Sequence, residues 1–267
     1  NVPANYEVEV LKIENAVSMA AGYNEGMLKT DAKYKIYMHH DVYIYNRDFI
    51  RDIIEIFEAD KTIGLLGVVG GSDLPKNATI WDSWNLGGTY GTDNYRVQKI
   101  NFYQNPEIPV MEADAIDGML MVTQYDLPWR EDIFDGWDFY DISQSMEFRR
   151  KGYKVVIPYQ TDYWCMHDCG HSKLINYDKY REKFLDEYKE YSGAEFVPKV
   201  QPEIWKIQEQ IFERLKSVFN AGDYKSVFLM IEGMQDAYIS DNNLRYAQNF
   251  YDIYQRELGI QTLGFFE

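Results

Sequence analysis

In the first part of the chain, segments with the hydrophobic pattern of a strand alternate with segments that have the pattern of a helix. Apolar residues alternate with polar ones, or form a short glycine-flanked run, in three segments: 6–13, 33–39 and 62–71. Such patterns are typical of strands. Helical spacing or good helix formers occupy the two segments between them, 18–30 and 47–60, and Ser18 is suited to the N-cap of the first. This order predicts an α/β domain with a largely parallel sheet.

Similar patterns continue, with longer interruptions, toward residue 175. Residues 72–112 are rich in turn signals such as GGTYGTD and NPEIPV, which predict loops. Three further elements are predicted: strands at 117–125 and 153–158, and a helix at 138–152. Gly152 ends that helix. The stretch 163–172 is irregular and full of side chains that can bind metals.

After about residue 175 the pattern becomes helical. The charged stretch YDKYREKFLDEYKEY predicts one helix, and the turn NAGD at 220–223 places Asp223 where it can cap another. An apolar stripe at helical spacing lies between them: Ile204, Ile207, Ile211 and Leu215. We therefore divide the chain into an α/β domain at 1–175 and an all-α extension at 176–267, which offers a surface for contact with a partner protein.

Composition narrows the class of protein. The chain has 267 residues, 46% of them hydrophobic, and a net charge of −16, which argues against a nucleic-acid-binding surface. Two cysteines are too few for a disulfide framework, and no apolar run reaches the roughly 18 residues of a membrane span. The opening NVPANYEVEV lacks the features of a signal peptide. These observations predict a soluble cytoplasmic protein that handles anions through a metal or local dipoles.

Two imidazoles and a carboxylate follow the strand predicted at 33–39. Because side chains alternate along a strand, His39 and Asp41 point the same way and His40 points the other way. His39 and Asp41 would be about 7 Å apart on an ideal strand, and a small bend would let both reach one divalent cation. The alternative is a solvated turn at the end of a strand, since one His and one Asp make an incomplete metal site.

Two other segments carry candidate functional residues near helices. Asn15, Asn24 and Gly26 punctuate the passage into the first predicted helix, where small residues let a helix approach the sheet or a ligand closely. Ordinary helix packing would use the same residues. Asp138 and Asp141 begin a later helix, where the helix dipole stabilises carboxylates. They are either a general base held ionised at that position or ordinary acidic residues of a helix start.

Four side chains that can bind metals occur at steps of two: Cys165, His167, Cys169 and His171. A zinc site would need them close together, but in an extended chain they would spread over roughly 20 Å. Structural zinc sites usually use tighter chelating pairs. One His of this group, acting as a distant ligand of a metal at Asp41, is more plausible.

These segments, in their order, resemble the family 2-like glycosyltransferases of the GT-A fold, in particular the bacterial glycosyltransferase-like branch. The matching stretches are NAVSMAAGYNEGM, AKYKIYMHHDVYI, IGLLGVVGG, AIDGMLMVTQYDLPW, GWDFYDISQSMEFRRKGYKVVIP and WCMHDCGHS. They cover roughly residues 6 to 175, and the helical tail resembles an extension often seen on these proteins. The resemblance implies a mixed, mainly parallel sheet flanked by helices, here without the first strand and helix that cradle the nucleobase.

The resemblance also implies where the donor and the metal bind. The family's D-x-D motif falls on residues 39–41, so that Asp41 is its last Asp, a ligand of Mn²⁺ or Mg²⁺. His39 stands in place of the first Asp, next to the ribose, and His167 matches a His that can complete the metal shell. The segment beside the nucleotide-sugar is matched by three residues: Asn15, Asn24 and Gly26.

For the chemistry, Asp117 and Gly118 match the segment that lines the sugar and acceptor region, and Asp141 matches the base that deprotonates the acceptor hydroxyl. The implied activity is that of an inverting, metal-dependent hexosyltransferase. It would move sugar from a UDP-type donor to a glycan, polysaccharide or glycoprotein. The lost first carboxylate at His39 motivates an alternative, a degenerate GT-A domain that binds sugar nucleotide or glycan without turnover. A scaffold acting through its helical tail is a third interpretation.

Overall fold

The computed structural model describes residues 1–80, 83–93, 96–168 and 176–194, together with 214, 217–223 and 225–226. The chain forms two compact units, Asn1–Phe196 and Val197–Glu267. The first unit therefore extends past the boundary expected at residue 175. In the second, Ser226 N donates a 3.1 Å hydrogen bond to Asp223 Oδ1, which confirms the predicted cap. The apolar stripe of the extension lies outside the described residues.

One five-stranded sheet forms the centre of the first unit. Its strands, in spatial order, are β1 (Lys35–Met38), β9 (Leu120–Thr123), β3 (Ile63–Gly67), β10 (Lys154–Pro158) and β7 (Val110–Glu112). β3 and β10 are parallel, whereas the other neighbouring pairs are antiparallel. The mixed α/β sheet expected from the sequence is confirmed. Its strand directions are more mixed than expected, because β9 enters between β1 and β3 and runs against both.

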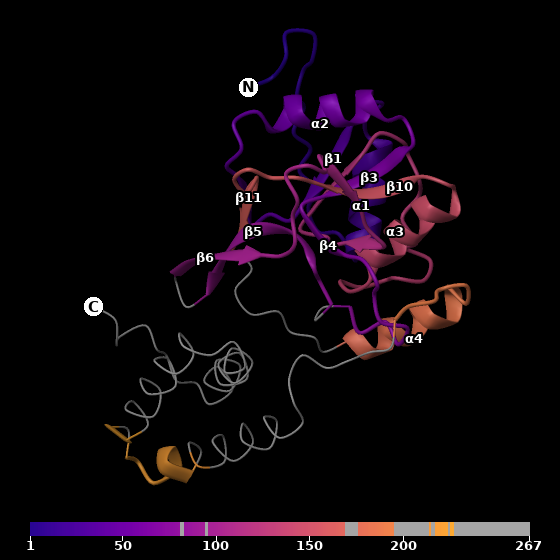
Figure 1. Ribbon diagram of the computed structural model, residues 1–267. Coiled ribbons are helices and arrows are strands. Elements are labelled where there is room, and N and C mark those ends of the chain that lie inside the picture. The colour runs from indigo at the N-terminus through magenta and orange to yellow at the C-terminus, as the bar shows by residue number, and fades with distance from the viewer. Residues whose placement is uncertain are drawn as a thin grey trace. The chain divides into compact units, whose positions relative to one another are not determined.

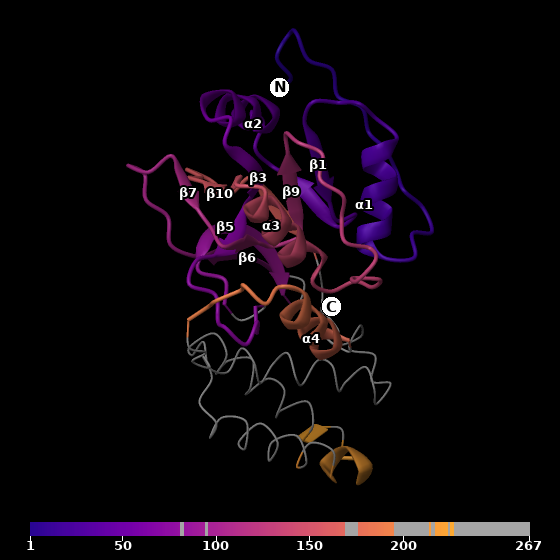
Figure 2. The same cartoon turned by 90° about the vertical axis from the view of Figure 1, so that its right-hand side faces the viewer.

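Helices cover both faces of this sheet (Figure 1). α2 (Phe49–Ala59) packs on one face, where its apolar side chains join Leu66 and Val156 in one core cluster. α1 (Met19–Leu28) and α3 (Tyr140–Arg150) share a second cluster with Leu65 and Val155. Since neighbouring residues of a strand point to opposite faces, these clusters lie on the two sides of the sheet, and Figure 2 shows α2 apart from α1 and α3.

The predicted helices are largely confirmed, and their ends follow local chemistry. Ser18 Oγ accepts a 3.1 Å hydrogen bond from Ala21 N and caps α1 as predicted. α3 ends just before Gly152, whose φ of +82° suits glycine. The charged stretch expected to be helical forms α4 (Tyr177–Glu187), which buries Tyr180 and Phe184 in the first unit.

A second sheet lies beside the first and includes the region expected to be loops. Its strands are β2 (Val42–Ile44), β11 (Cys165–His167), β5 (Leu86–Asp93), β4 (Val69–Gly71) and β8 (Ala115–Ile116), and β6 (Arg96–Asn101) pairs with β5. The reading of GGTYGTD as a turn was wrong, because these residues form most of β5. A Cβ on Gly88 would lie 2.5 Å from the Tyr163 ring, so glycine there serves close packing.

The strand predicted at 6–13 does not form. The segment carries no strand pairing, and Val8 and Val10 are 53% and 87% exposed. It is held at its ends instead, where Tyr6 packs on Tyr34 and Ile13 contacts α1. Alternation predicts a strand only where one side of the segment is buried against a sheet, and here neither side is.

Candidate active site

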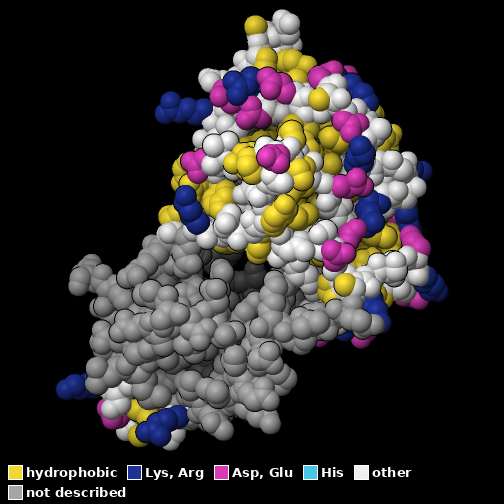
Figure 3. Space-filling view, in the orientation of Figure 1, with side chains coloured by type: hydrophobic (Ala, Val, Ile, Leu, Met, Phe, Trp, Pro, Cys, Tyr) yellow, Lys and Arg dark blue, Asp and Glu magenta, His cyan; other side chains and the backbone are white. Residues whose placement is uncertain are grey.

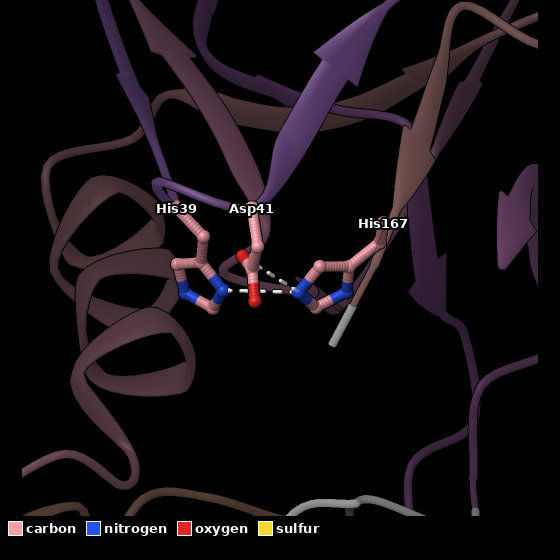
Figure 4. Close-up of side chains that lie close together, drawn as sticks. All are labelled: His39, Asp41 and His167. Carbon is pink, nitrogen blue, oxygen red and sulfur yellow. Dashed lines mark hydrogen bonds and ion pairs between the residues drawn. The ribbon is translucent and has the colours of Figure 1, made fainter. Parts of the chain in front are cut away.

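Residues 39–41 form a turn that joins β1 to β2. His39 N donates to Met119 O at 3.1 Å, and Val42 N donates to His39 O at 3.3 Å. β11 pairs with β2 so that His167 lies opposite Val42. The turn and this register bring three side chains from distant parts of the chain together, and Figure 4 shows His39, Asp41 and His167 pointing toward one another.

The geometry of this group suits a divalent metal ion. His39 Nδ1 lies 3.3 Å from His167 Nε2, which in turn lies 3.4 Å from Asp41 Oδ1. One ligand atom from each residue lies within 4.8 Å of the other two. Asp41 Oδ1 is buried and has no hydrogen-bond partner, a costly state that a cation would relieve. Imidazole nitrogens and a carboxylate oxygen are the donors that divalent transition metals use in proteins.

Asp141, the expected base, is connected to the metal group through the backbone of Gly118 and Met119. Gly118 N donates to Asp141 Oδ2 at 2.9 Å, and the carbonyl of Met119 accepts from His39 N. Burial, and then the charge of Asp117, raise the pKa of Asp141 to about 7. A carboxyl that is half ionised near neutral pH is suited to take a proton from a hydroxyl.

Tyr140 lies between the metal group and Asp141. The sequence did not single it out. Its hydroxyl lies 2.5 Å from His39 Nε2, and its ring is buried at the start of α3. A Cβ on Gly118 would lie 2.1 Å from that hydroxyl, so the tyrosine needs glycine there. The one sequence signal for Tyr140 is its position directly before Asp141.

The expected donor-binding residues on and before α1 do not join this group in the structure. Asn15 is exposed and has a φ of +57°. Asn24 is buried, and its side-chain amide exchanges hydrogen bonds of 2.9 and 2.8 Å with the backbone of Trp129. A Cβ on Gly26 would lie 3.6 Å from Ile13, an ordinary van der Waals distance. Asn24 therefore holds α1 against the segment at Trp129, and Gly26 lies beside Ile13.

Two of the four residues considered for a zinc site fall within the described part of the chain. His167 belongs to the metal group described above. Cys165 is buried in the core cluster beneath α2, and burial raises the pKa of its thiol to about 11, which disfavours the thiolate that binds zinc. Cys169 and His171 lie outside the described residues.

The mixed α/β sheet flanked by helices, with His39 and Asp41 at the end of β1, is consistent with a GT-A fold. In agreement, the family described as "Glycosyltransferase like family" matches residues 1–188, and the chain belongs to this family. Membership supports glycosyl transfer in general. No curated protein matches the chain. Among the described residues, no helix is long and apolar enough to cross a membrane.

Proposed function

We propose that this protein is a metal-dependent glycosyltransferase that moves a sugar from a nucleoside-diphosphate donor to a hydroxyl of a glycan, polysaccharide or glycoprotein. The convergence of His39, Asp41 and His167 beside a carboxyl whose pKa is raised to about 7 carries the proposal. A donor diphosphate needs positive charge nearby, and an acceptor hydroxyl needs a base. The two halves of the site meet these two needs.

The metal half would be held by His39 Nδ1, Asp41 Oδ1 and His167 Nε2. A bound divalent ion supplies Lewis-acid stabilisation of the charge that develops on the leaving diphosphate. Two nitrogen donors and one oxygen donor favour Mn²⁺ over Mg²⁺, because Mg²⁺ prefers oxygen ligands.

The base half would act by single displacement. Asp141 takes the proton of the acceptor hydroxyl as its oxygen forms a bond to the anomeric carbon of the sugar. The bond from that carbon to the diphosphate oxygen breaks on the opposite face, and the nucleoside diphosphate leaves with the bonding pair. The configuration at the anomeric carbon is therefore inverted. Gly118, which donates to Asp141, and Asp117, whose charge helps to raise the pKa of Asp141, would line the sugar.

The donor contacts proposed for α1 are of a different kind. Asn15 is exposed before the helix and is free to approach a nucleotide-sugar. We assign Asn24 and Gly26 an indirect part, in which they fix α1 beside the donor rather than contact it, since Asn24 is bonded to Trp129.

Turnover of UDP-sugars with Mn²⁺ or Mg²⁺ tests the proposal. We expect release of UDP from one of a panel of donors, faster with Mn²⁺. Asp141→Asn should lower kcat by about 100-fold or more, the usual worth of a general base. Asp41→Ala should weaken Mn²⁺ binding by at least the roughly 10-fold that losing a supporting partner costs. Asp178→Asn, a change at the exposed start of α4, is the matched control.

Two results would contradict this assignment. If Asp41→Ala and Asp141→Asn both turn over like the control, neither residue has the proposed role. If UDP raises the melting temperature in a Mn²⁺-dependent way but no donor is hydrolysed or transferred to any acceptor, the protein is a binding domain without turnover.

A further inference from the structure

The two ring nitrogens of His39 face different partners. Nδ1 faces His167 Nε2 at 3.3 Å, on the side of Asp41, and Nε2 faces the hydroxyl of Tyr140 at 2.5 Å. A neutral imidazole carries its proton on one nitrogen and presents a lone pair on the other. The partner of the second nitrogen decides which of the two is available to a metal.

We propose that Tyr140 is a positioning residue that accepts a hydrogen bond from His39 Nε2 and so fixes the tautomer in which the Nδ1 lone pair faces the metal group. The inference rests on the proposed function, in which His39 replaces a carboxylate as a metal ligand. An ionised carboxylate presents lone pairs on both oxygens. A neutral imidazole presents a lone pair only on the nitrogen that carries no proton, so it needs a partner that selects its tautomer.

The charges around Tyr140 favour this direction of the hydrogen bond. The Asp141 carboxyl lies near the phenol, because Gly118, whose N–H donates to Asp141 Oδ2 at 2.9 Å, also lies against the Tyr140 hydroxyl, and Asp117 directly precedes Gly118. Negative charge attracts the hydroxyl hydrogen and turns it toward the carboxylates. The phenol oxygen then offers its lone pairs to the N–H of His39. The opposite direction would place a proton on Nδ1, between His39 and His167.

The position of the hydroxyl is fixed by packing on both sides. The Tyr140 ring lies against Tyr23 and Trp129, with centroid distances of 5.9 and 6.4 Å. On the other side, Gly118 provides the space that the hydroxyl occupies, since a Cβ there would lie 2.1 Å from it. Gly118 thus serves the metal group through Tyr140.

The first test is the Mn²⁺ affinity of the whole chain without donor. It is measured by titration calorimetry, or by the loss of the free Mn²⁺ signal in electron paramagnetic resonance. Tyr140→Phe should weaken Mn²⁺ binding by about 10- to 100-fold, as loss of a partner of a ligating His does. Gly118→Ala should do the same by displacing the hydroxyl. Tyr23→Phe, which removes another buried hydroxyl from the same aromatic cluster, should keep the wild-type affinity.

A double-variant comparison separates positioning from general damage. In a His39→Ala background, Tyr140→Phe should cause no further loss of Mn²⁺ affinity, because the imidazole it positions is gone. An equal loss in both backgrounds would overturn the inference. So would a wild-type protein that binds Mn²⁺ and transfers sugar while Tyr140→Phe keeps full Mn²⁺ affinity, and that result would leave the proposed function standing.

The tautomer itself is measurable without metal. The chain has four histidines, and His39→Gln identifies the His39 signals in a long-range ¹⁵N–¹H spectrum of the metal-free protein. We expect a protonated Nε2 and a bare Nδ1 in the wild type and in Tyr23→Phe, and a mixture in Tyr140→Phe. A protonated Nδ1 in the wild type would overturn the inference, and this readout holds even if no sugar transfer is found.

Discussion

At the scale of single residues, the site depends on where its carboxylates lie. Asp41 presents to the two imidazoles a buried oxygen without a hydrogen bond, whereas Asp141 is bonded to the backbone at Gly118 and Ile142. The first environment calls for a cation. In the second, burial and the nearby charge of Asp117 raise the pKa of the carboxyl more than the two backbone hydrogen bonds lower it. Two carboxyls on neighbouring segments are thereby suited to different tasks.

The raised pKa of Asp141 predicts how the rate depends on pH. A general base acts in its ionised form, so kcat/KM should rise with pH and level off above the pKa of the base, which is about 7. Initial rates with saturating Mn²⁺ across about pH 5.5 to about pH 8.5 measure this. Asp141→Asn should remove the inflection along with most of the activity.

Asp138 is the comparison for that profile. It lies three positions earlier, and burial raises its pKa as well. Asp138→Asn should keep the inflection near 7 that is expected of the wild type. A profile that becomes flat in Asp138→Asn would make Asp138 the base instead of Asp141, and a flat wild-type profile would argue against any carboxyl of raised pKa in the rate-limiting proton transfer.

At the scale of elements, the sequence predicted the helices well because their signals are local. α1 has its Ser18 cap, α2 has a sustained apolar stripe, and α3 stops at Gly152. The strand β5 was missed because its glycines look like turn residues. A larger residue would not fit at Gly88 or Gly91, because Tyr163 and Ile100 occupy the space that its side chain would take. The local sequence pattern does not show such contacts, because the partners come from other segments.

The site shows the same limit. The alternation around residues 39–41 predicted that His39 and Asp41 face one way, and the turn does bring them together. His167 joins them only through the register of β11 on β2, which the sequence does not specify. Its part came from family resemblance, and Tyr140 had no signal beyond its place before Asp141. Chemistry carried by neighbours in sequence was predictable, and chemistry assembled by strand pairing was not.

The two hydrogen bonds between Asn24 of α1 and the backbone of Trp129 form a clamp between these segments. This clamp gives a prediction at the scale of elements. Asn24→Ala removes two buried hydrogen bonds and leaves the N–H of Trp129 unpaired, whereas its C=O keeps the 2.8 Å hydrogen bond from Glu131 N. An unpaired buried group costs about 1–3 kcal/mol, so we expect a loss of about 1–3 kcal/mol in the free energy of unfolding, measured by urea denaturation. The Mn²⁺ affinity of the folded variant, measured without urea, should stay near that of wild type.

This variant also tests the role first expected for Asn24. Asn15→Gly is its counterpart, because Asn15 is exposed and its φ of +57° suits glycine, so the change should leave stability nearly unchanged. If Asn24→Ala keeps wild-type stability but loses affinity for the donor, the side chain contacts the donor directly and the clamp is dispensable.

At the scale of the whole molecule, charge decides how an anionic donor can be held. The net charge is −16, and on the described face in Figure 3 basic side chains are scattered among acidic ones rather than gathered in a patch. Three carboxylates, Asp41, Asp117 and Asp141, surround the proposed reaction centre and influence its titrating groups. Such a surface repels a diphosphate unless a cation intervenes.

Nucleotide binding should therefore depend on the metal and respond to salt in an unusual direction. We expect UDP to bind at least about 10-fold more tightly with Mn²⁺ than with EDTA, because the ion provides the positive charge that the site lacks. With EDTA present, raising NaCl from about 0.05 M to about 0.3 M shortens the screening length and weakens the repulsion. The residual affinity should then hold steady or increase. Calorimetric titration of UDP under these conditions measures both effects, with uridine as the uncharged control. UDP that binds equally well in EDTA and loses affinity with salt would show that cationic side chains, rather than the group of His39, Asp41 and His167, hold the diphosphate.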